Sequence, residues 1–148
     1  MVKIASRASV LSLMKIPDEL MSKTIIKSMF FERYVSLIKN SWVKLDQVIL
    51  NEKLYNIENH ASDEVDNLFN FQDIFALESD LLREHFITVL FENLLLPVLI
   101  GSVVATKRQH QILSLPLCIF LIAHLLNTVK YKPVLNVIFS VVFMPQIR

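Results

Sequence analysis

The most regularly patterned stretch of the sequence is 34–49, which reads YVSLIKNSWVKLDQVI. Its apolar residues recur at steps of three and four, while its charged residues fall elsewhere on the helical wheel. This period predicts an amphipathic helix with one face directed at a core. Trp42 could instead anchor a binding partner, but its place on the stripe favours core packing. The predicted core face carries Tyr34, Leu37, Ile38, Ser41, Trp42, Leu45, Val48 and Ile49.

Glycine is almost absent from the chain. Gly101 is the single glycine among 148 residues, and 53% of the residues are hydrophobic. Phosphate-binding loops, tight hairpins and strand bulges need residues that tolerate positive φ, which glycine does at the least cost. The composition therefore argues against a nucleotide-binding α/β fold and against a many-stranded sandwich. We predict an all-α fold.

The remaining helices are delimited by prolines and by polar capping residues. Pro17 ends the first helix, Asp18 and Glu19 open the second, and Ser79 with Asp80 opens a later one. That later helix presents an apolar side that carries Leu82, Phe86, Val89, Leu90 and Leu94. The basic stretch from Thr106 to Gln111 is expected to be a loop. Besides the helix at 34–49, the expected helices are Val2–Lys15, Glu19–Phe30, a solvated helix within Asn51–Phe75, one from Asp80 toward Pro97, and the apolar segments 115–126 and 133–144.

About seven helices with modest connections would suit a right-handed stack of helix pairs, as in armadillo or HEAT solenoids. No repeat of constant period is visible, so a compact bundle is the alternative. We expect residues 1–148 to form one helical domain. Because helical periodicity starts almost at the first residue, we also expect the chain to be a fragment of a larger solenoid.

The few chemically active side chains form no convincing constellation. His60 with Asp63 and Glu64 would lie one turn apart, but no second histidine follows at metal spacing, so a wet helix face is the better interpretation. His85 is expected to be a surface imidazole, and His124 a hydrogen-bonded core or edge residue. Cys118 is expected to be a small core residue rather than a reactive thiol, because His124, six residues on, would lie on roughly the opposite helix face.

These observations predict no catalytic, cofactor-binding or metal-binding residues, and we expect no enzymatic activity, no small-molecule substrate and no cofactor. The formal charge of +1 gives no footprint of nucleic-acid binding. We therefore expect a non-enzymatic helical scaffold that acts through contacts with other proteins. The alternative is an integral membrane protein inserted through 94–105, 115–126 and 133–144. These tracts are short for spanning helices, which need about 20 mainly apolar residues.

Four short motifs occur in an order and spacing that resemble a known family. They are Met1-Val2-Lys3-Ile4-Ala5-Ser6-Arg7, Asn93-Leu94-Leu95-Leu96-Pro97, Leu113-Ser114-Leu115-Pro116-Leu117 and Lys132-Pro133-Val134-Leu135. The sequence is similar to the family named for C-type lectin domain family 16 member A, which includes the plant transparent testa trafficking protein. The similarity is weaker between Asn51 and Asp73, and the basic loop around Lys107 and Arg108 departs from it.

The resemblance implies that 1–50 correspond to the end of an FPL domain and 51–148 to the helical region that follows. It implies an α-solenoid that supports endosome, lysosome and Golgi traffic, with consequences for autophagy. The implied partners are trafficking proteins such as a small GTPase or its regulators, and the implied location is the cytoplasm, peripheral to those membranes. Lectin chemistry is not implied, since one cysteine cannot form the disulfides of such a domain.

Overall fold

The computed structural model describes residues 2–51 and 54–143, with side chains over 8–51, 57–107, 109–140 and 143. This part of the chain is helical and contains no strand, so the predicted all-α class is confirmed. The finer expectation of a solenoid stays a prediction. The elements are α1 (Val2–Met14), α2 (Glu19–Lys27), α3 (Phe30–Leu50), α4 (Leu54–Phe75), α5 (Asp80–Leu90), the π-helical η1 (Phe91–Ile100), α6 (Gly101–Val104), the 3₁₀ turn η2 (Arg108–His110), α7 (Leu115–Thr128) and α8 (Lys132–Phe143).

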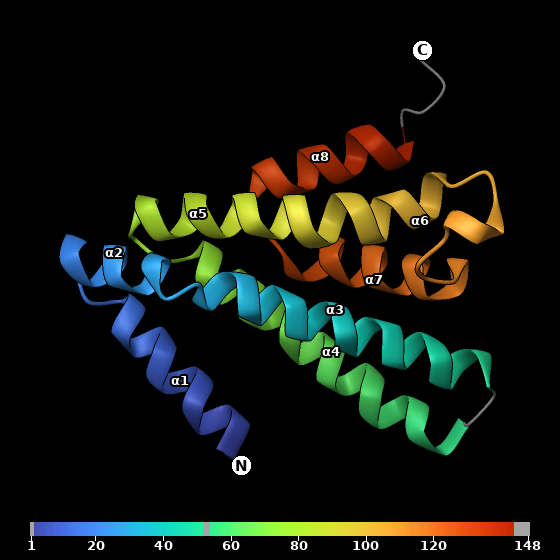
Figure 1. Cartoon of the computed structure of the whole chain (residues 1–148), viewed down its shortest axis with the longest axis horizontal. Helices are drawn as coiled ribbons and strands as arrows, with labels where there is room; N and C mark the ends of the chain where they lie inside the picture. Colours follow the sequence, from blue (N-terminus) through green and yellow to red (C-terminus); the bar gives the residue numbers. More distant parts are fainter. Residues whose placement is uncertain (1, 52–53, 144–148) are drawn as a thin grey trace.

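The helices pack around one long rod formed by α5, η1 and α6, which run on without a break from Asp80 to Val104 (Figure 1). The antiparallel pair α3 and α4 packs along one side of this rod, and α8 packs against η1. Both α6 and α4 contact α7. By contrast, α1 diverges from the α3–α4 pair and joins the body mainly through α2.

Local chemistry sets most helix ends as expected, with one correction near Phe30. The Asp18 side chain accepts a hydrogen bond of 2.9 Å from the Leu20 N–H and begins α2. The prediction that this helix reaches Phe30 is wrong, because α2 ends at Lys27 and Met29 takes a left-handed conformation with φ 56°. Phe30 then begins α3, where its ring stacks on Tyr34 one turn later, at 6.0 Å between centroids.

The prediction that the helix after Ser79 ends toward Pro97 is also wrong. Proline lacks the N–H that a regular α-helix would pair, but the backbone widens into the π-helical stretch η1 and continues past Pro97. The Gly101 N–H closes this stretch by reaching the Leu96 carbonyl, five residues back. A Cβ at position 101 would lie 3.2 Å from the same oxygen, so the single glycine stands where the backbone is crowded.

The core joins residues from both halves of the chain around Phe86. Its ring lies 5.1 Å from that of Phe31, 5.7 Å from Phe71 and 5.3 Å from Phe75. The predicted apolar side of this helix is confirmed, because Leu82, Phe86, Val89, Leu90 and Leu94 are all buried. Aromatic pairs in these tilted and edge-to-face geometries stabilise a core beyond their buried area.

Trp42 is fully buried, which confirms its predicted place in the core. The predicted stripe is wrong at Leu37, which is 68% exposed because α3 is covered by α4 and the rod on its other sides only. It also missed Asp46, which was expected on the polar face and is buried. Asp46 is the first sign that polar groups, as well as apolar ones, organise the interior.

Candidate functional site

An apolar groove lies where α1 diverges from the α3–α4 pair. Its volume is about 410 Å³, which is within the size range of ligand-binding pockets. Phe69 stands on its wall with 56% of its surface exposed, although it is a large aromatic residue. The groove is lined by Ala8, Val10, Leu11 and Met14 of α1, Phe30 and Tyr34 of α3, and Asp66, Phe69, Asn70, Asp73 and Ile74 of α4.

Two carboxylates, Asp66 and Asp73, stand along the α4 side of this groove. Both are exposed, and neither makes a hydrogen bond or an ion pair with any side chain that the structure describes. They are seven residues apart in α4, so they project from the same helix face about 10 Å apart along the axis. The groove therefore combines an apolar floor with a negatively charged rim.

The groove continues past α1 into a second, more polar cleft of about 740 Å³. The two cavities share Leu11, Met14 and Asp73. Several of the cleft's acidic groups already have local partners, since Asp18 caps α2 and Glu19 pairs with Lys23 at 2.7 Å. The cleft continues around the end of α1, where its charged lining is mainly acidic but also includes Lys15.

The structure separates the residues of the metal hypothesis at 60–64. Glu64 is buried between α3 and α4, where it accepts hydrogen bonds from Ser41 and, at 3.1 Å, from Asn67, while Asp63 is exposed. Burial raises the pKa of Glu64 above 4.5, and the hydrogen bonds from Ser41 and Asn67 oppose that shift. Among the side chains that are described, no three His, Cys, Asp or Glu residues are placed to hold a metal ion.

Asp46 organises the start of α7. Its carboxylate accepts hydrogen bonds from the backbone N–H of Ser114, at 3.0 Å, and from the Ser114 hydroxyl. Ser114 is the residue that precedes the first turn of α7, so a negative group from α3 sits at the positive end of that helix dipole. Asp46 is thus a structural cap for α7 that is supplied by another helix, and its own side chain is buried.

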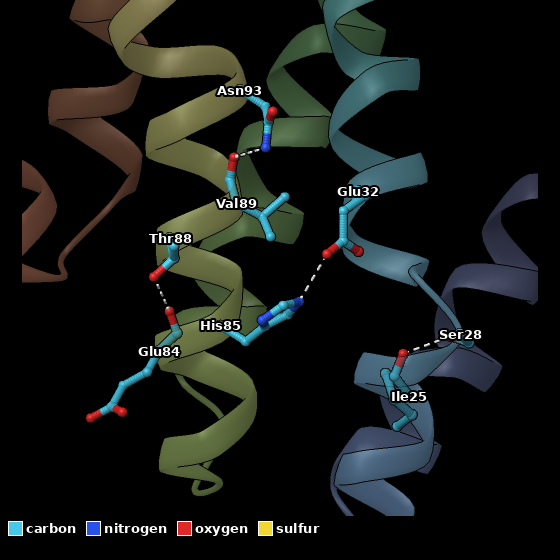
Figure 2. A network of polar contacts seen from close by, with 8 residues as sticks. All are labelled: Ile25, Ser28, Glu32, Glu84, His85, Thr88, Val89 and Asn93. Atoms are coloured by element: carbon cyan, nitrogen blue, oxygen red, sulfur yellow. Dashed lines mark hydrogen bonds and ion pairs between the residues drawn. The ribbon is translucent and has the colours of Figure 1, made fainter.

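His85 is not the surface imidazole that we predicted. Figure 2 shows its ring reaching from α5 toward α3, where Nε2 lies 3.1 Å from the Glu32 carboxylate. Both side chains are only about a quarter exposed, at 27% and 29%. The pair joins two core helices, and neither residue lines the groove.

Cys118 is fully buried, which confirms the expectation of a small core residue. Burial, with a smaller contribution from the charge of Asp46, raises the pKa of its thiol to about 11. Because the thiolate is the reactive form, this environment disfavours a nucleophile. His124 is half-buried with its ring 4.4 Å from that of Phe120, and no hydrogen bond links it to Cys118.

The predicted basic loop is confirmed in outline, with the short turn η2 inside it. The hydroxyl of Ser102 fixes its return to the body, since it accepts hydrogen bonds from the N–H groups of Ile112, at 3.2 Å, and Leu113, at 3.0 Å. The same hydroxyl donates to the Val98 carbonyl at 2.5 Å. The loop is therefore anchored at its C-terminal end.

Within the described residues, one helix is long and apolar enough to cross a membrane by length and composition, the rod Asp80–Val104. Its Leu94, Leu95 and Leu99 are fully buried among the other helices. Of the three apolar tracts, 94–104 lies in this rod with Ala105 directly after it, 115–126 lies in α7 and 133–143 lies in α8, while Met144 lies outside the described residues. A helix buried on several sides has the same composition.

The groove was not found from the sequence, although Asp66, Phe69 and Asp73 were visible as one face of a helix. Of the motifs that carry the family resemblance, residues 2–7 lie in α1, which forms one wall of the groove, while Met1 lies outside the described residues. The other motifs lie away from the groove, at 93–97 in η1, at 113–117 around the start of α7 and at 132–135 at the start of α8. No model of a known protein family matches the sequence, and no curated protein and no solved structure is significantly similar to it.

Proposed function

We propose that this chain is a non-enzymatic helical scaffold that docks a cationic amphipathic helix of a partner protein in the groove between α1 and α4. The observation that carries the proposal is the combination in one cavity of an apolar floor with the exposed carboxylates Asp66 and Asp73. Amphipathic helices bind grooves of this kind through apolar anchors at three- and four-residue steps.

The spacing of the two carboxylates sets the geometry of such a partner. A helix lying along α4 would place lysine or arginine side chains two turns apart beside Asp66 and Asp73, and its leucines against Phe69 and Met14. The apolar contacts would supply most of the affinity. The exposed charges would chiefly set orientation and association rate, and salt would screen them.

In the cell, we place this scaffold at endosomal, lysosomal or Golgi membranes, where it would recruit trafficking proteins such as a small GTPase or its regulators and so affect autophagy. This part of the proposal is supported by the resemblance of the three motifs at 93–97, 113–117 and 132–135. An α-solenoid to which this segment belongs would extend the docking surface.

The groove is tested with a defined probe, a fluorescent helical peptide with leucines at i, i+3, i+4 and i+7 flanked by lysines. We expect saturable binding to the full chain, and we expect Asp66→Lys with Asp73→Lys to weaken it about tenfold. The matched control is Leu37→Ser with Lys39→Glu, which changes an exposed leucine and a charge on α3 outside the groove. A scrambled peptide of equal composition controls for charge alone.

Equal binding of the scrambled peptide, or an unchanged affinity of the Asp66→Lys, Asp73→Lys variant, would contradict the docking groove. The cellular role is tested separately, by cross-linking the chain in endolysosomal extracts and identifying the products by mass spectrometry. We expect a small GTPase or a GTPase regulator that disappears with the same double variant. Recovery of no trafficking protein would contradict the cellular role while leaving the groove result intact.

A second candidate function is favoured by one observation, the length and apolar character of the rod Asp80–Val104. In that case the chain would be an integral membrane protein held by its apolar tracts. Insertion would require the helices that now cover Leu94 and Leu95 to separate from the rod.

A further inference from the structure

Charge is divided sharply along the chain. All 14 acidic residues lie between Asp18 and Glu92, so the last 56 positions of the 148-residue sequence contain no carboxylate side chain. The basic residues are not divided in this way. Those that follow Glu92 are Lys107, Arg108, Lys130, Lys132 and Arg148.

The same C-terminal region exposes a stripe of apolar side chains along α7. Leu115 is 50% exposed and Ile119, one turn later, is 60% exposed, and Ala123 continues the line. At the N-terminal end of the helix, Val104 and Ile112 add further exposed apolar surface, at 53% and 44%. Exposed large apolar residues that recur at helical spacing on one face mark an interaction surface more than chance exposure does.

This surface is held in place by the polar contacts at the start of α7. The Ser102 hydroxyl accepts hydrogen bonds from the N–H groups of Ile112 and Leu113. The Asp46 carboxylate accepts hydrogen bonds from the N–H and the hydroxyl of Ser114. The exposed apolar side chains therefore stand on a fixed framework. Lysines lie beyond both ends of the stripe, Lys107 in the loop before α7 and Lys130 with Lys132 after it, and all three are exposed.

We infer that the outer face of α7 and the basic loop before it bind the surface of a bilayer that contains anionic lipids. With 14 residues, α7 is about 21 Å long, too short to span a hydrocarbon core, and would lie in the plane of the interface. Leu115 and Ile119 enter the acyl boundary while Lys107, Lys130 and Lys132 contact phosphate and carboxylate headgroups. A lipid surface fits better than a protein, because α7 itself has no Lys, Arg, Asp or Glu, the segments on either side of it carry basic residues, and the sequence after Glu92 has no carboxylate side chain to pair with a partner's basic groups.

The inference deepens the proposed scaffold function, on which its cellular meaning rests, but it uses a surface separate from the groove. The test is sedimentation of the full chain with vesicles of phosphatidylcholine alone or mixed with an equal part of phosphatidylserine. We expect binding to the mixed vesicles only, reversed by high salt. Lys107→Gln and Lys130→Gln should each lower the partition coefficient about fivefold, since a basic residue near such a surface is worth roughly 1 kcal/mol.

Ile119→Asn should lower the partition coefficient about tenfold, because it removes an apolar side chain that would enter the bilayer. The control is again Leu37→Ser with Lys39→Glu on α3, which should bind as the unaltered chain does. Equal binding to neutral vesicles, no binding to either kind, or an equal loss in the control would overturn the inference. The peptide assay on the groove is unaffected by the α7 variants, so failure of one proposal is distinguishable from failure of the other.

Discussion

Glu64 is a carboxylate that the fold keeps almost entirely out of water, with 1% of its surface exposed. Burial raises its pKa above 4.5, so the charged form is less favourable in the folded state than in the unfolded chain. The protonated carboxyl of Glu64 therefore stabilises the folded state fully at pH values below the unfolded-state pKa. This stabilisation is lost as pH rises through the folded-state pKa. We expect Glu64→Gln to become more stable relative to the unaltered chain as pH rises above about 4.5.

The measurement is urea unfolding of both proteins across this pH range. The variant keeps one side-chain oxygen to accept the bond from Ser41 or Asn67, so its packing should persist. Two stability curves that stay parallel across the range would show that Glu64 does not titrate as its burial implies.

Trp42 and Leu37 form a matched pair on α3 that tests the register of its core face. Trp42 is fully buried and Leu37 is 68% exposed, although both belong to the predicted stripe. We expect Trp42→Ala to lower the free energy of unfolding by about 3–5 kcal/mol. Leu37→Ala should change it by less than about 0.5 kcal/mol. Denaturant titration measures both, and similar losses would mean that α3 is rotated about its axis.

Among the helices, α1 is the element with the least support. Within its described part, residues 8–14, Met14 is the one fully buried side chain, and its packing partner is mainly α2. Regions with few buried apolar contacts open at low free energy. We expect the amides of α1 to exchange with deuterium at least about tenfold faster than those in the middle of α3.

Hydrogen exchange followed by mass spectrometry reports this difference directly. The cationic helical peptide should slow exchange in α1 on binding, because α1 forms one wall of the groove. Protection of α1 equal to that of α3 in the unliganded chain would contradict the packing described here.

The elements themselves were largely readable from the sequence. Pro17, Asp18 and Ser79 act locally, so the ends that they set were predicted well. The errors have two different causes. At Phe30 the break is local, since Met29 takes a left-handed conformation and Phe30 begins α3 with its ring stacked on Tyr34 one turn later. Pro97, by contrast, is tolerated because the rod is packed against other helices and widens into η1, which a short window of sequence does not show.

At the scale of the whole molecule, the main feature is an uneven distribution of charge, because the fold places acidic and basic residues on different surfaces. The groove and cleft beside α1 gather Asp66, Asp73 and Asp18, whereas the segments on either side of α7 carry the basic residues Lys107, Arg108, Lys130 and Lys132 and no carboxylate side chain. The net charge of +1 hides this separation. Each candidate surface is formed by helices that lie side by side in the fold. The charged residues could be counted in the sequence, but which of them share a surface could not be predicted from it.

At this scale the peripheral and integral alternatives can be separated by alkaline carbonate extraction of membranes that carry the chain. We expect release into the soluble fraction, because Leu94, Leu95 and Leu99 of the rod are covered by protein. A protein with a known membrane-spanning helix, extracted from the same membranes, serves as the control that should stay in the lipid pellet. Retention of this chain in the lipid pellet would favour the integral alternative and contradict the interfacial placement of α7.

Cys118 offers a practical consequence of tight packing in α7. The chain has a single cysteine, it is 0% exposed, and burial holds its thiol pKa near 11. Alkylating reagents can reach the sulfur only when the helices around α7 separate. The rate at which Cys118 is alkylated therefore reports how often the core opens. Mass spectrometry measures this rate without the need for an engineered cysteine or a fluorescent group.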